Sequence, residues 1–347
     1  MKVALVHDWL TGMRGGERVL EELCTLFPGA TIFTLFHKPG SVSRRIESMD
    51  IRSSFLNRIP GALRNYRSML PLFPLAISGF DLHGFDLVFS VSHAAAKGIR
   101  KPPGGLHICY CLTPMRYIWD LQKDYFQYAD PIRIKRTAMH VMTHPLRMWD
   151  RAAACGVDHF IADSWHVQRR ISRYYDRESD VIYPPVDTEF FTGSRNGKHA
   201  EYYLVVSALV PYKRVDVAIR AFNRLGHPLI VAGAGPDLAR LRRMAAPNID
   251  FRGFVTDHAL RDLYRNCRAV IITAREDFGL VSLEAQACGR PALAYAAGGA
   301  LESIVDGNTG ILYGSQTADS LIEGVKKFER MRFSSEVLRY NAERFSR

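Results

Sequence analysis

The sequence predicts an α/β protein built from two Rossmann-like, doubly wound domains. Short apolar segments that are typical of buried parallel strands alternate with amphipathic helical segments along the chain. The alternation stops at a proline-containing segment, residues 181–187, and starts again after it. A chain of 347 residues is also longer than one hydrophobic core usually supports. We therefore expect two domains of ordinary size.

The first half opens with a predicted buried strand, residues 3–7, and a turn that ends in Gly15 and Gly16. A helix with one apolar face follows at residues 17–26. Glycine at a helix start lets backbone N–H groups come close to an anion, usually a phosphate. Further parallel strands are predicted at residues 31–36, 86–93 and 106–112.

The middle of the chain carries aromatic residues and prolines. Residues 68–77 are apolar but contain Pro71 and Pro74, so one long helix is not expected there. Residues 113–120 place aromatic side chains beside Arg116, which could hold the face of a sugar and a phosphate or carboxylate. The alternative is a loop packed on the core.

The predicted domain boundary lies in the extended segment 181–187, whose prolines exclude a helix. A strand at residues 160–164 and a basic helix at 166–175 precede it. We expect a first domain of residues 1–185, a second of residues 186–332 and a C-terminal helix, 333–347, that crosses back toward the first domain.

The second half repeats the strand and helix pattern. A strand at residues 203–207 leads through a loop with Lys213 and Arg214 into a helix, 215–225, and a strand, 229–232. Gly233 and Gly235 then stand where a dinucleotide fingerprint would begin, but Leu238 occupies the position of its third glycine. NAD binding is therefore not expected.

Two carboxylates frame a helix start near residue 280. An apolar strand at residues 269–273 is followed by Glu276, by Phe278, Gly279 and Leu280 at the start of the helix, and by Glu284 about two turns later. Unpaired backbone N–H groups and the helix dipole favour a phosphate at the helix start, while the carboxylates suit hydroxyl groups on either side. This order of groups matches a nucleoside diphosphate sugar. The alternative is a helix start with two solvated acids.

Composition and charge narrow the class of protein. The net charge is +11, and the N-terminal half carries the larger share. Between Arg44 and Arg67, basic residues alternate with apolar ones, which suits an anionic membrane surface. The alternative is an amphipathic surface helix with a solvated face. A nucleic-acid binder would rest on charge alone, without any recognisable module, so nucleic acid is not an expected partner.

The cellular location is predicted to be the cytoplasm, with peripheral contact to the inner face of the plasma membrane. No apolar run reaches the roughly 18 residues that a membrane helix needs, and the N-terminus already reads as a strand. The six cysteines lack the paired spacing of a zinc site and are expected to be reduced thiols.

The segment from Arg275 to Pro291, with seven residues between its two glutamates, resembles the C-terminal motif of the retaining family 4 glycosyltransferases. Gly298-Gly299 and Thr309-Gly310 follow as in that family, and the resemblance extends over most of the chain. It is closest to bacterial enzymes that build lipid-linked polysaccharide repeats, often mannosyltransferases. The resemblance implies the GT-B architecture, in which two Rossmann-like domains face each other across a cleft that holds the donor.

The resemblance also implies roles for individual residues. Glu276 would contact the donor sugar, Glu284 the ribose, and the first glycine loop the diphosphate. Lys213 would stabilise negative charge on the departing diphosphate. Many relatives carry a further arginine before this lysine; the chain has Ser207-Ala208-Leu209 there, so Arg214 is the expected substitute. No DxD motif is present, so no metal or other cofactor is expected.

One position departs from the family pattern in a way that affects catalysis. Where the family places an active-site histidine at the end of a strand, this chain has Leu112. His93 and His107 remain in the first domain, and His107 belongs to the start of that strand.

Together with the resemblance, these observations predict a glycosyltransferase that moves a hexose, mannose from GDP-mannose as first choice, to a lipid-linked or oligosaccharide acceptor. The resemblance implies that the reaction retains the anomeric configuration. The alternative is a non-catalytic sugar-nucleotide-binding homologue, because of Leu112. The predicted site residues are Glu276 and Lys213 as catalytic, Gly15, Gly16, Arg214, Phe278, Gly279, Leu280 and Glu284 as donor-binding, and His93 and Arg116 on the acceptor side, with no metal ligand.

Overall fold

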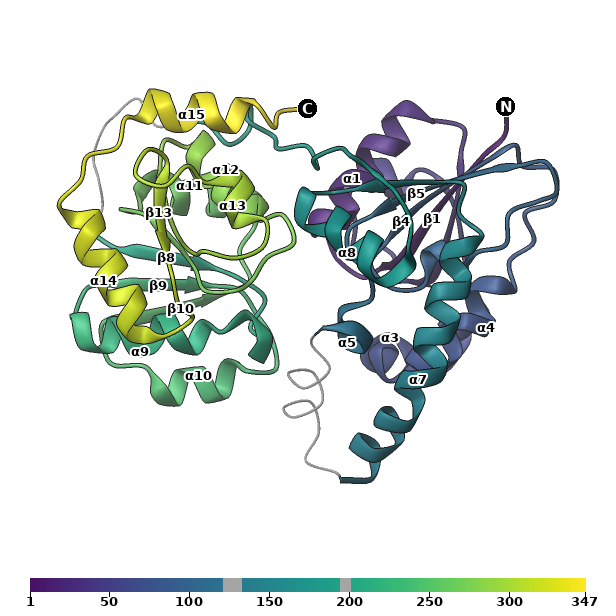
Figure 1. Cartoon of the computed structure of the whole chain (residues 1–347), viewed down its shortest axis with the longest axis horizontal. Helices are drawn as coiled ribbons and strands as arrows, with labels where there is room; N and C mark the ends of the chain where they lie inside the picture. The colour runs from purple at the N-terminus through teal and green to yellow at the C-terminus, as the bar shows by residue number, and fades with distance from the viewer. Residues whose placement is uncertain (121–132, 194–200) are drawn as a thin grey trace. The chain divides into compact units, whose positions relative to one another are not determined.

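The computed structural model describes residues 1–120, 133–193 and 201–347 (Figure 1). The chain divides into two compact units, Met1–Pro184 and Pro185–Arg347. This division falls one residue before the boundary expected from the prolines.

The first unit contains a seven-stranded sheet in which every strand pair is parallel. Its order is β3-β2-β1-β4-β5-β6-β7, so the strand order reverses between β1 and β4. The strands are β1 (Val3–Leu10), β2 (Thr31–His37), β3 (Asp50–Ser53), β4 (Leu87–Ser92), β5 (Leu106–Cys111), β6 (His159–Ala162) and β7 (Asp180–Val181).

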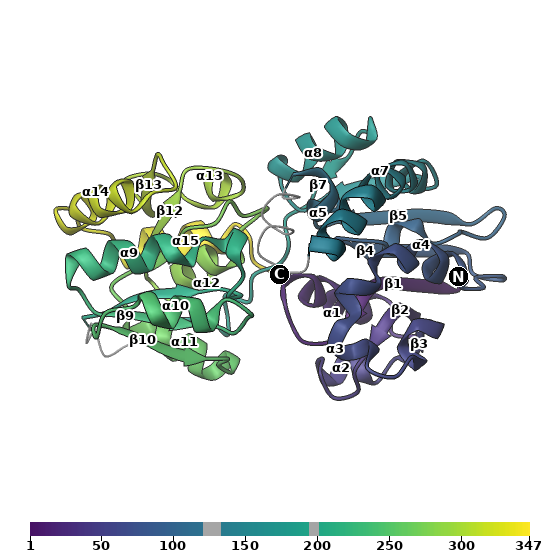
Figure 2. The same cartoon turned by 90° about the horizontal axis from the view of Figure 1, so that it is seen from below.

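Helices cover both faces of this sheet. Apolar residues of α1 and α2 pack on the face that carries Val3 and Leu5, whereas α4, η3 and their neighbours pack on the face that carries Ala4 and Val6. Figure 2 shows α1 and α4 beside β1 from a second side. The helices are α1 (Gly15–Leu26), α2 (Arg44–Glu47), α3 (Ala62–Asn65), α4 (Phe73–Ser78), α5 (Arg116–Trp119), α7 (Arg133–Cys155) and α8 (Trp165–Tyr175), with 3₁₀ turns η1 (Phe55–Arg58), η2 (Tyr66–Leu72) and η3 (Ala96–Gly98).

The second unit repeats the plan with a six-stranded parallel sheet of order β10-β9-β8-β11-β12-β13. Its strands are β8 (Tyr203–Val206), β9 (Leu229–Ala232), β10 (Ile249–Gly253), β11 (Val270–Ile272), β12 (Ala292–Tyr295) and β13 (Gly310–Tyr313). Its helices are η4 (Pro211–Lys213), α9 (Val215–Leu225), α10 (Leu238–Met244), α11 (Asp257–Asn266), α12 (Leu280–Ala287), α13 (Ala300–Ser303), α14 (Ala318–Glu329) and α15 (Ser335–Glu343). Helices α9 and α14 contribute to one core, and α11, α12 and α15 border the other.

Sheet pairing changes two of the sequence-based assignments, and a third is confirmed. The first strand continues through Asp8 to Leu10, where a turn was predicted, because Trp9 and Leu10 pair with the end of β2. The basic segment 44–67 contains the edge strand β3 as well as short helices, because residues 50–53 pair with β2. Residues 68–77 are split between η2 and α4, as their prolines predicted.

The C-terminal helix α15 packs against α12 of the second unit (Figure 1). Asn341 of α15 donates hydrogen bonds to the Gln286 side chain at 2.7 Å and to the Ser303 carbonyl at 3.1 Å. The predicted crossing of this helix to the first domain stays a prediction. All six cysteines are free thiols, and within the described residues no helix combines the length and apolarity needed to span a membrane.

Candidate functional site

Each sheet offers a natural binding position where its strand order reverses. In doubly wound sheets, ligands bind beyond the carboxyl ends of the strands at this point, because the loops leave the sheet in opposite directions there. The point lies between β1 and β4 in the first unit and between β8 and β11 in the second. The predicted residues can therefore be compared with two defined positions.

In the second unit, Lys213 and Glu276 meet at this position. Lys213 ends η4 after β8, Glu276 follows β11, and the Lys213 Nζ atom lies 2.6 Å from Glu276 Oε2. The two side chains are only 16% and 21% exposed. Thr273 at the end of β11 donates a hydrogen bond of 2.8 Å to the Lys213 carbonyl, which ties the two loops together. The structure thus brings the two predicted catalytic residues into one ion pair.

Helix α12 begins beside this pair at Gly279, whose φ of +96° favours glycine. The helix start has no side-chain cap, which makes it a potential phosphate site. Gly298 and Gly299 pass very close to this turn: a Cβ atom on Gly299 would lie 2.3 Å from the Phe278 Cα atom. Phe278 is buried and packs against the ring of Phe345. These contacts fix the shape of the helix start.

The second predicted glutamate, Glu284, accepts a hydrogen bond of 2.8 Å from the hydroxyl of Tyr264 on α11. Tyr264 is fully buried. Burial and the nearby carboxylate of Glu284 raise the pKa of Tyr264 well above its usual value, so the hydroxyl remains a donor. The sequence analysis missed Tyr264, since a tyrosine on the preceding helix carries no motif that marks it.

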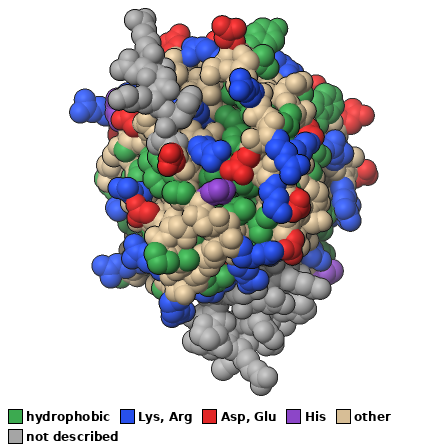
Figure 3. All heavy atoms as spheres, turned by 90° about the vertical axis from the view of Figure 1, so that its left-hand side faces the viewer, with side chains coloured by type: hydrophobic (Ala, Val, Ile, Leu, Met, Phe, Trp, Pro, Cys, Tyr) green, Lys and Arg blue, Asp and Glu red, His purple; other side chains and the backbone are tan. Residues whose placement is uncertain are grey.

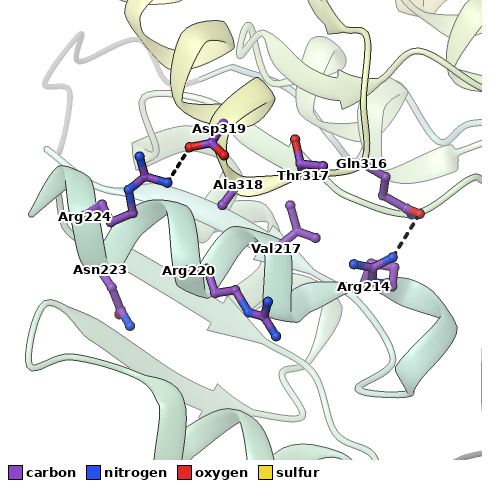
Figure 4. Close-up of a pocket in the computed structure, with 9 residues that line it drawn as sticks. All are labelled: Arg214, Val217, Arg220, Asn223, Arg224, Gln316, Thr317, Ala318 and Asp319. Atoms are coloured by element: carbon purple, nitrogen blue, oxygen red, sulfur yellow. Dashed lines mark hydrogen bonds and ion pairs between the residues drawn. The ribbon is translucent and has the colours of Figure 1, made fainter.

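The side chain of Arg214 contacts Gln316 and Asp216. Its φ of +53° lies in the left-handed region, which is unfavourable for a residue with a side chain. Figure 4 shows its guanidinium directed toward Gln316, with 3.4 Å between Nη1 and Oε1, and a second contact at 3.2 Å joins its Nε atom to Asp216. It lines a separate pocket between α9 and the start of α14. Contact of Arg214 with a donor diphosphate stays a prediction.

In the first unit, His93 is held at the switch position by Asp8. The carboxylate of Asp8 is completely buried and accepts hydrogen bonds of 2.6 to 2.9 Å from the four backbone N–H groups of residues 93–96. His93 Nδ1 lies 3.1 Å from Asp8 Oδ2, and the His93 side chain is 26% exposed. Burial alone would raise the pKa of Asp8, but His93, His7 and these N–H donors outweigh it and lower the pKa.

The protonation state of His93 follows from the same surroundings. Burial lowers the pKa of His93, while the charge of Asp8 acts in the opposite direction without restoring the ordinary value. At neutral pH the ring is therefore mainly neutral and presents one donor and one acceptor nitrogen. The sequence offered no sign that Asp8 would orient this histidine across 85 positions of the chain.

Gly16 of the first glycine loop lies beside Leu112 and His7 in the same unit. A Cβ atom on Gly16 would stand 2.7 Å from Leu112 Cδ1 and 3.2 Å from His7 Cε1, so both side chains pack directly on the glycine loop. His7 is fully buried, 3.6 Å from Glu17, and neither of its ring nitrogens has a hydrogen-bond partner among the described residues. The structure therefore places Leu112 at the first glycine loop.

Arg116 lies on a short helix of the first unit, and His107 lies inside the sheet of that unit. Arg116 starts the short helix α5, and the loop before it is held by Arg170, which donates to the Pro114 carbonyl at 3.2 Å. His107 lies inside the sheet at 2.8 Å from Ser90 Oγ, which is a structural contact.

In the three described ranges no group of three or more His, Cys, Asp or Glu side chains could hold a metal ion. Metal independence itself stays a prediction.

The sequence match to a family model lies within the second unit. Residues 187–345 match the family model described as Glycosyl transferases group 1. An uncharacterized glycosyltransferase of Methanocaldococcus jannaschii is 25% identical over 206 residues, which cover 58% of each protein. The D-inositol 3-phosphate glycosyltransferase of Mycolicibacterium smegmatis is 34% identical over 154 residues, which cover 38% of this chain and 36% of that enzyme. The matches thus span 36% to 58% of the length of these relatives.

Structural comparison covers the whole chain. Anabaena HepE in complex with UDP and glucose superposes with a TM-score of 0.72 at 17% identity, covering 100% of this chain and 95% of that one. Sucrose-phosphate synthase from Thermosynechococcus elongatus gives 0.70 at 15% identity, covering 99% and 95%. The predicted fold class is confirmed: the chain has the two parallel-sheet α/β domains of the GT-B fold.

Proposed function

We propose that this chain, whose residues 187–345 carry the sequence pattern of the glycosyl transferases group 1, is a glycosyltransferase with a nucleoside diphosphate sugar as its donor. The observation that supports this most directly is the Lys213–Glu276 pair beside the uncapped start of α12. The cation and the phosphate-binding helix start suit the diphosphate of such a donor, and the carboxylate suits hydroxyl groups of its sugar.

The donor would lie along the loops of the second unit. The diphosphate would accept hydrogen bonds from Lys213 and from the backbone N–H groups of Phe278, Gly279 and Leu280. Glu276 would accept hydrogen bonds from sugar hydroxyls, and Glu284, already oriented by Tyr264, from the ribose hydroxyls. Arg214 would contribute from the flank, because its guanidinium points toward Gln316.

The proposed reaction breaks the bond between the sugar C1 atom and the diphosphate oxygen and forms a bond from C1 to an acceptor hydroxyl oxygen. Negative charge grows on the departing phosphate, where Lys213 and the helix start stabilise it without transferring a proton. The acceptor proton would pass to the leaving diphosphate on the same face of the sugar. This front-face course would retain the anomeric configuration, and it requires no metal.

The first unit would supply the acceptor side. Gly15 and Gly16 would close on the diphosphate, and His93 and Arg116 would contact the acceptor. We propose a hexose as the transferred group and a lipid-linked or oligosaccharide acceptor of surface polysaccharide synthesis. Mannose from GDP-mannose is the first donor to test, and UDP-glucose is the second because HepE was solved with UDP and glucose.

A second candidate function is a sugar-nucleotide binder with little or no turnover. Leu112 supports it, because an aliphatic side chain packed on Gly16 can offer a donor sugar only apolar contact. The two candidates share the donor site and differ in whether nucleotide is released.

A thermal-shift panel of GDP, UDP, ADP and their sugars tests the donor site first. A ligand that binds only the folded protein raises the melting temperature according to its concentration and affinity. We expect one nucleotide and its sugar to shift the melting temperature clearly more than the others. Equal shifts from every nucleotide, or no shift, would contradict the proposal. Release of nucleoside diphosphate from the best donor then distinguishes an enzyme from a binder.

A further inference from the structure

An apolar and basic surface of the first unit has no role in the proposed reaction. Within residues 55–75, five large apolar side chains are exposed: Phe55 at 47%, Ile59 at 37%, Leu63 at 37%, Leu72 at 43% and Leu75 at 64%. The exposed residues Arg58, Arg64 and Arg67 lie among them in the sequence. We refer to these eight residues as the 55–75 surface. They belong to η1, α3, η2, α4 and the turns between them.

The 55–75 surface is firmly attached to the unit. Residues on the inner side of the same elements, Leu56, Tyr66, Leu70, Phe73 and Ile77, are buried in the core beneath β1 and β2. The consecutive elements pack on one another: η2 contacts both α3 and α4, and α3 also contacts η1. A surface helix normally turns polar residues outward once its apolar face is buried. Here leucines and a phenylalanine also face outward, and such patches mark interaction sites.

The charges of this surface are unusual as well. No Asp or Glu occurs between Ile51 and Phe80. None of the described residues forms an ion pair with Arg58, Arg64 or Arg67, although Arg67 lies over the Tyr66 ring at 5.2 Å. In the second unit, Arg224 pairs with Asp319 at 2.6 Å, and Figure 3 shows acidic and basic side chains interspersed on one face of that unit.

We propose that the 55–75 surface docks on an anionic lipid bilayer. The interface of such a bilayer offers apolar chain segments for the leucines and phenylalanine and anionic headgroups for the unpaired guanidinium groups. A nucleic acid would use the arginines alone and leave the apolar side chains in water. This inference goes beyond the proposed glycosyl transfer, and binding of lipid requires no donor.

The exposed apolar side chains coincide with only part of the predicted basic segment, residues 44–67. Arg52 pairs with Asp50 at 3.0 Å on the edge strand, and Arg44 and Arg45 lie on α2, which packs against α1. The exposed large apolar side chains begin at Phe55 and extend past Arg67 to Leu75.

Sedimentation of the full chain with vesicles tests the proposal. Vesicles of phosphatidylserine and phosphatidylcholine should bind the protein at low salt, whereas pure phosphatidylcholine should bind it weakly. Each basic residue near an anionic surface strengthens binding about fivefold, so Arg58→Glu with Arg64→Glu should weaken it at least about 25-fold. Leu72→Ser with Leu75→Ser should weaken binding even where salt already screens the arginines.

Two control variants match these changes. Arg243→Glu with Arg330→Glu makes the same change of net charge at exposed sites of the second unit, and Tyr340→Ser removes a side chain that is 72% exposed on α15. Both should bind vesicles like the unaltered chain. All variants should keep the melting temperature of the unaltered chain, since the substituted side chains are exposed.

Three results would overturn the proposal. The first is absence of binding to anionic vesicles by the unaltered chain. The second is an equal loss of binding in the control with the matched charge change. The third is binding to random duplex DNA that is as strong as binding to vesicles, when Leu72→Ser with Leu75→Ser weakens neither. None of these results depends on donor binding, so the membrane surface and the proposed transferase activity can fail separately.

Discussion

Replacing Lys213 with methionine, and Arg214 with methionine in a second variant, distinguishes the contributions of the two cations in the loop after β8. Lys213 contacts Glu276 at 2.6 Å, whereas the neighbouring Arg214 is directed toward Gln316 and Asp216. If Lys213 stabilises the departing diphosphate, its loss should lower kcat by about 10²- to 10³-fold, as loss of one preorganised charge-stabilising group does in other enzymes. Arg214→Met should lower kcat/KM by less than about fivefold, because a 40% exposed guanidinium contributes at most about 1 kcal/mol.

The structural role of the ion pair must be separated from its chemical role. Lys213→Met removes the cation beside the Glu276 carboxylate, which is 21% exposed, and the loss of this contact should lower the free energy of unfolding by about 1–3 kcal/mol. The double variant with Glu276→Gln also removes the negative charge that Lys213 balances and should recover most of that stability. It should not recover kcat, because the cation is still missing.

The assay is release of nucleoside diphosphate from the donor that gives the largest thermal shift, with rates corrected for the folded fraction of each variant. Urea titrations give the free energies of unfolding. The reasoning is refuted if Arg214→Met lowers kcat as strongly as Lys213→Met does. It is also refuted if the double variant regains the rate of the unaltered protein.

Three further predictions concern other parts of the two units. Glu284→Gln should weaken binding of free nucleotide roughly 10- to 150-fold, or about 1.5–3 kcal/mol, and titration calorimetry showing unchanged affinity would exclude the ribose contact. Leu112→His should raise sugar transfer at least several-fold with little change in nucleotide affinity, while Leu112→Met should not; loss of a brisk activity in the histidine variant would show that the sugar site is built differently. Burial lowers the pKa of His107 from 6.5 to about 4, so between these pH values the unfolded chain binds more protons than the folded chain. The free energy of unfolding should therefore fall on acidification through this range, by up to about 3 kcal/mol. Urea titrations of His107→Asn should show a flatter pH dependence.

The sequence predicted those parts of the site that follow from strand order and local turns. Lys213 and Glu276 each follow a buried strand, and neighbouring parallel strands place such residues on the same edge of a sheet. Gly279 was predicted at the helix start, where its positive φ is now seen. Both inferences use information within about ten residues of each position.

Contacts between distant segments were not predictable in the same way. The orientation of His93 depends on Asp8, and that of Glu284 on Tyr264, and neither pair has a spacing that a single sequence reveals. The direction of Arg214 depends on a left-handed backbone conformation that is uncommon for arginine. Strand β3 was missed because its pairing with β2, not its own composition, makes it a strand.

The two ends of the second unit lie side by side. Val186 pairs with Ser346, its N–H donates to the Phe345 carbonyl at 2.9 Å, and Asp187 contacts Arg347 at 3.3 Å. A polypeptide that enters and leaves a domain at one place can be inserted into a loop of another protein, or joined end to end and reopened elsewhere, with little strain. The second unit should therefore tolerate circular permutation, with new termini in an exposed turn such as the one around Gly226.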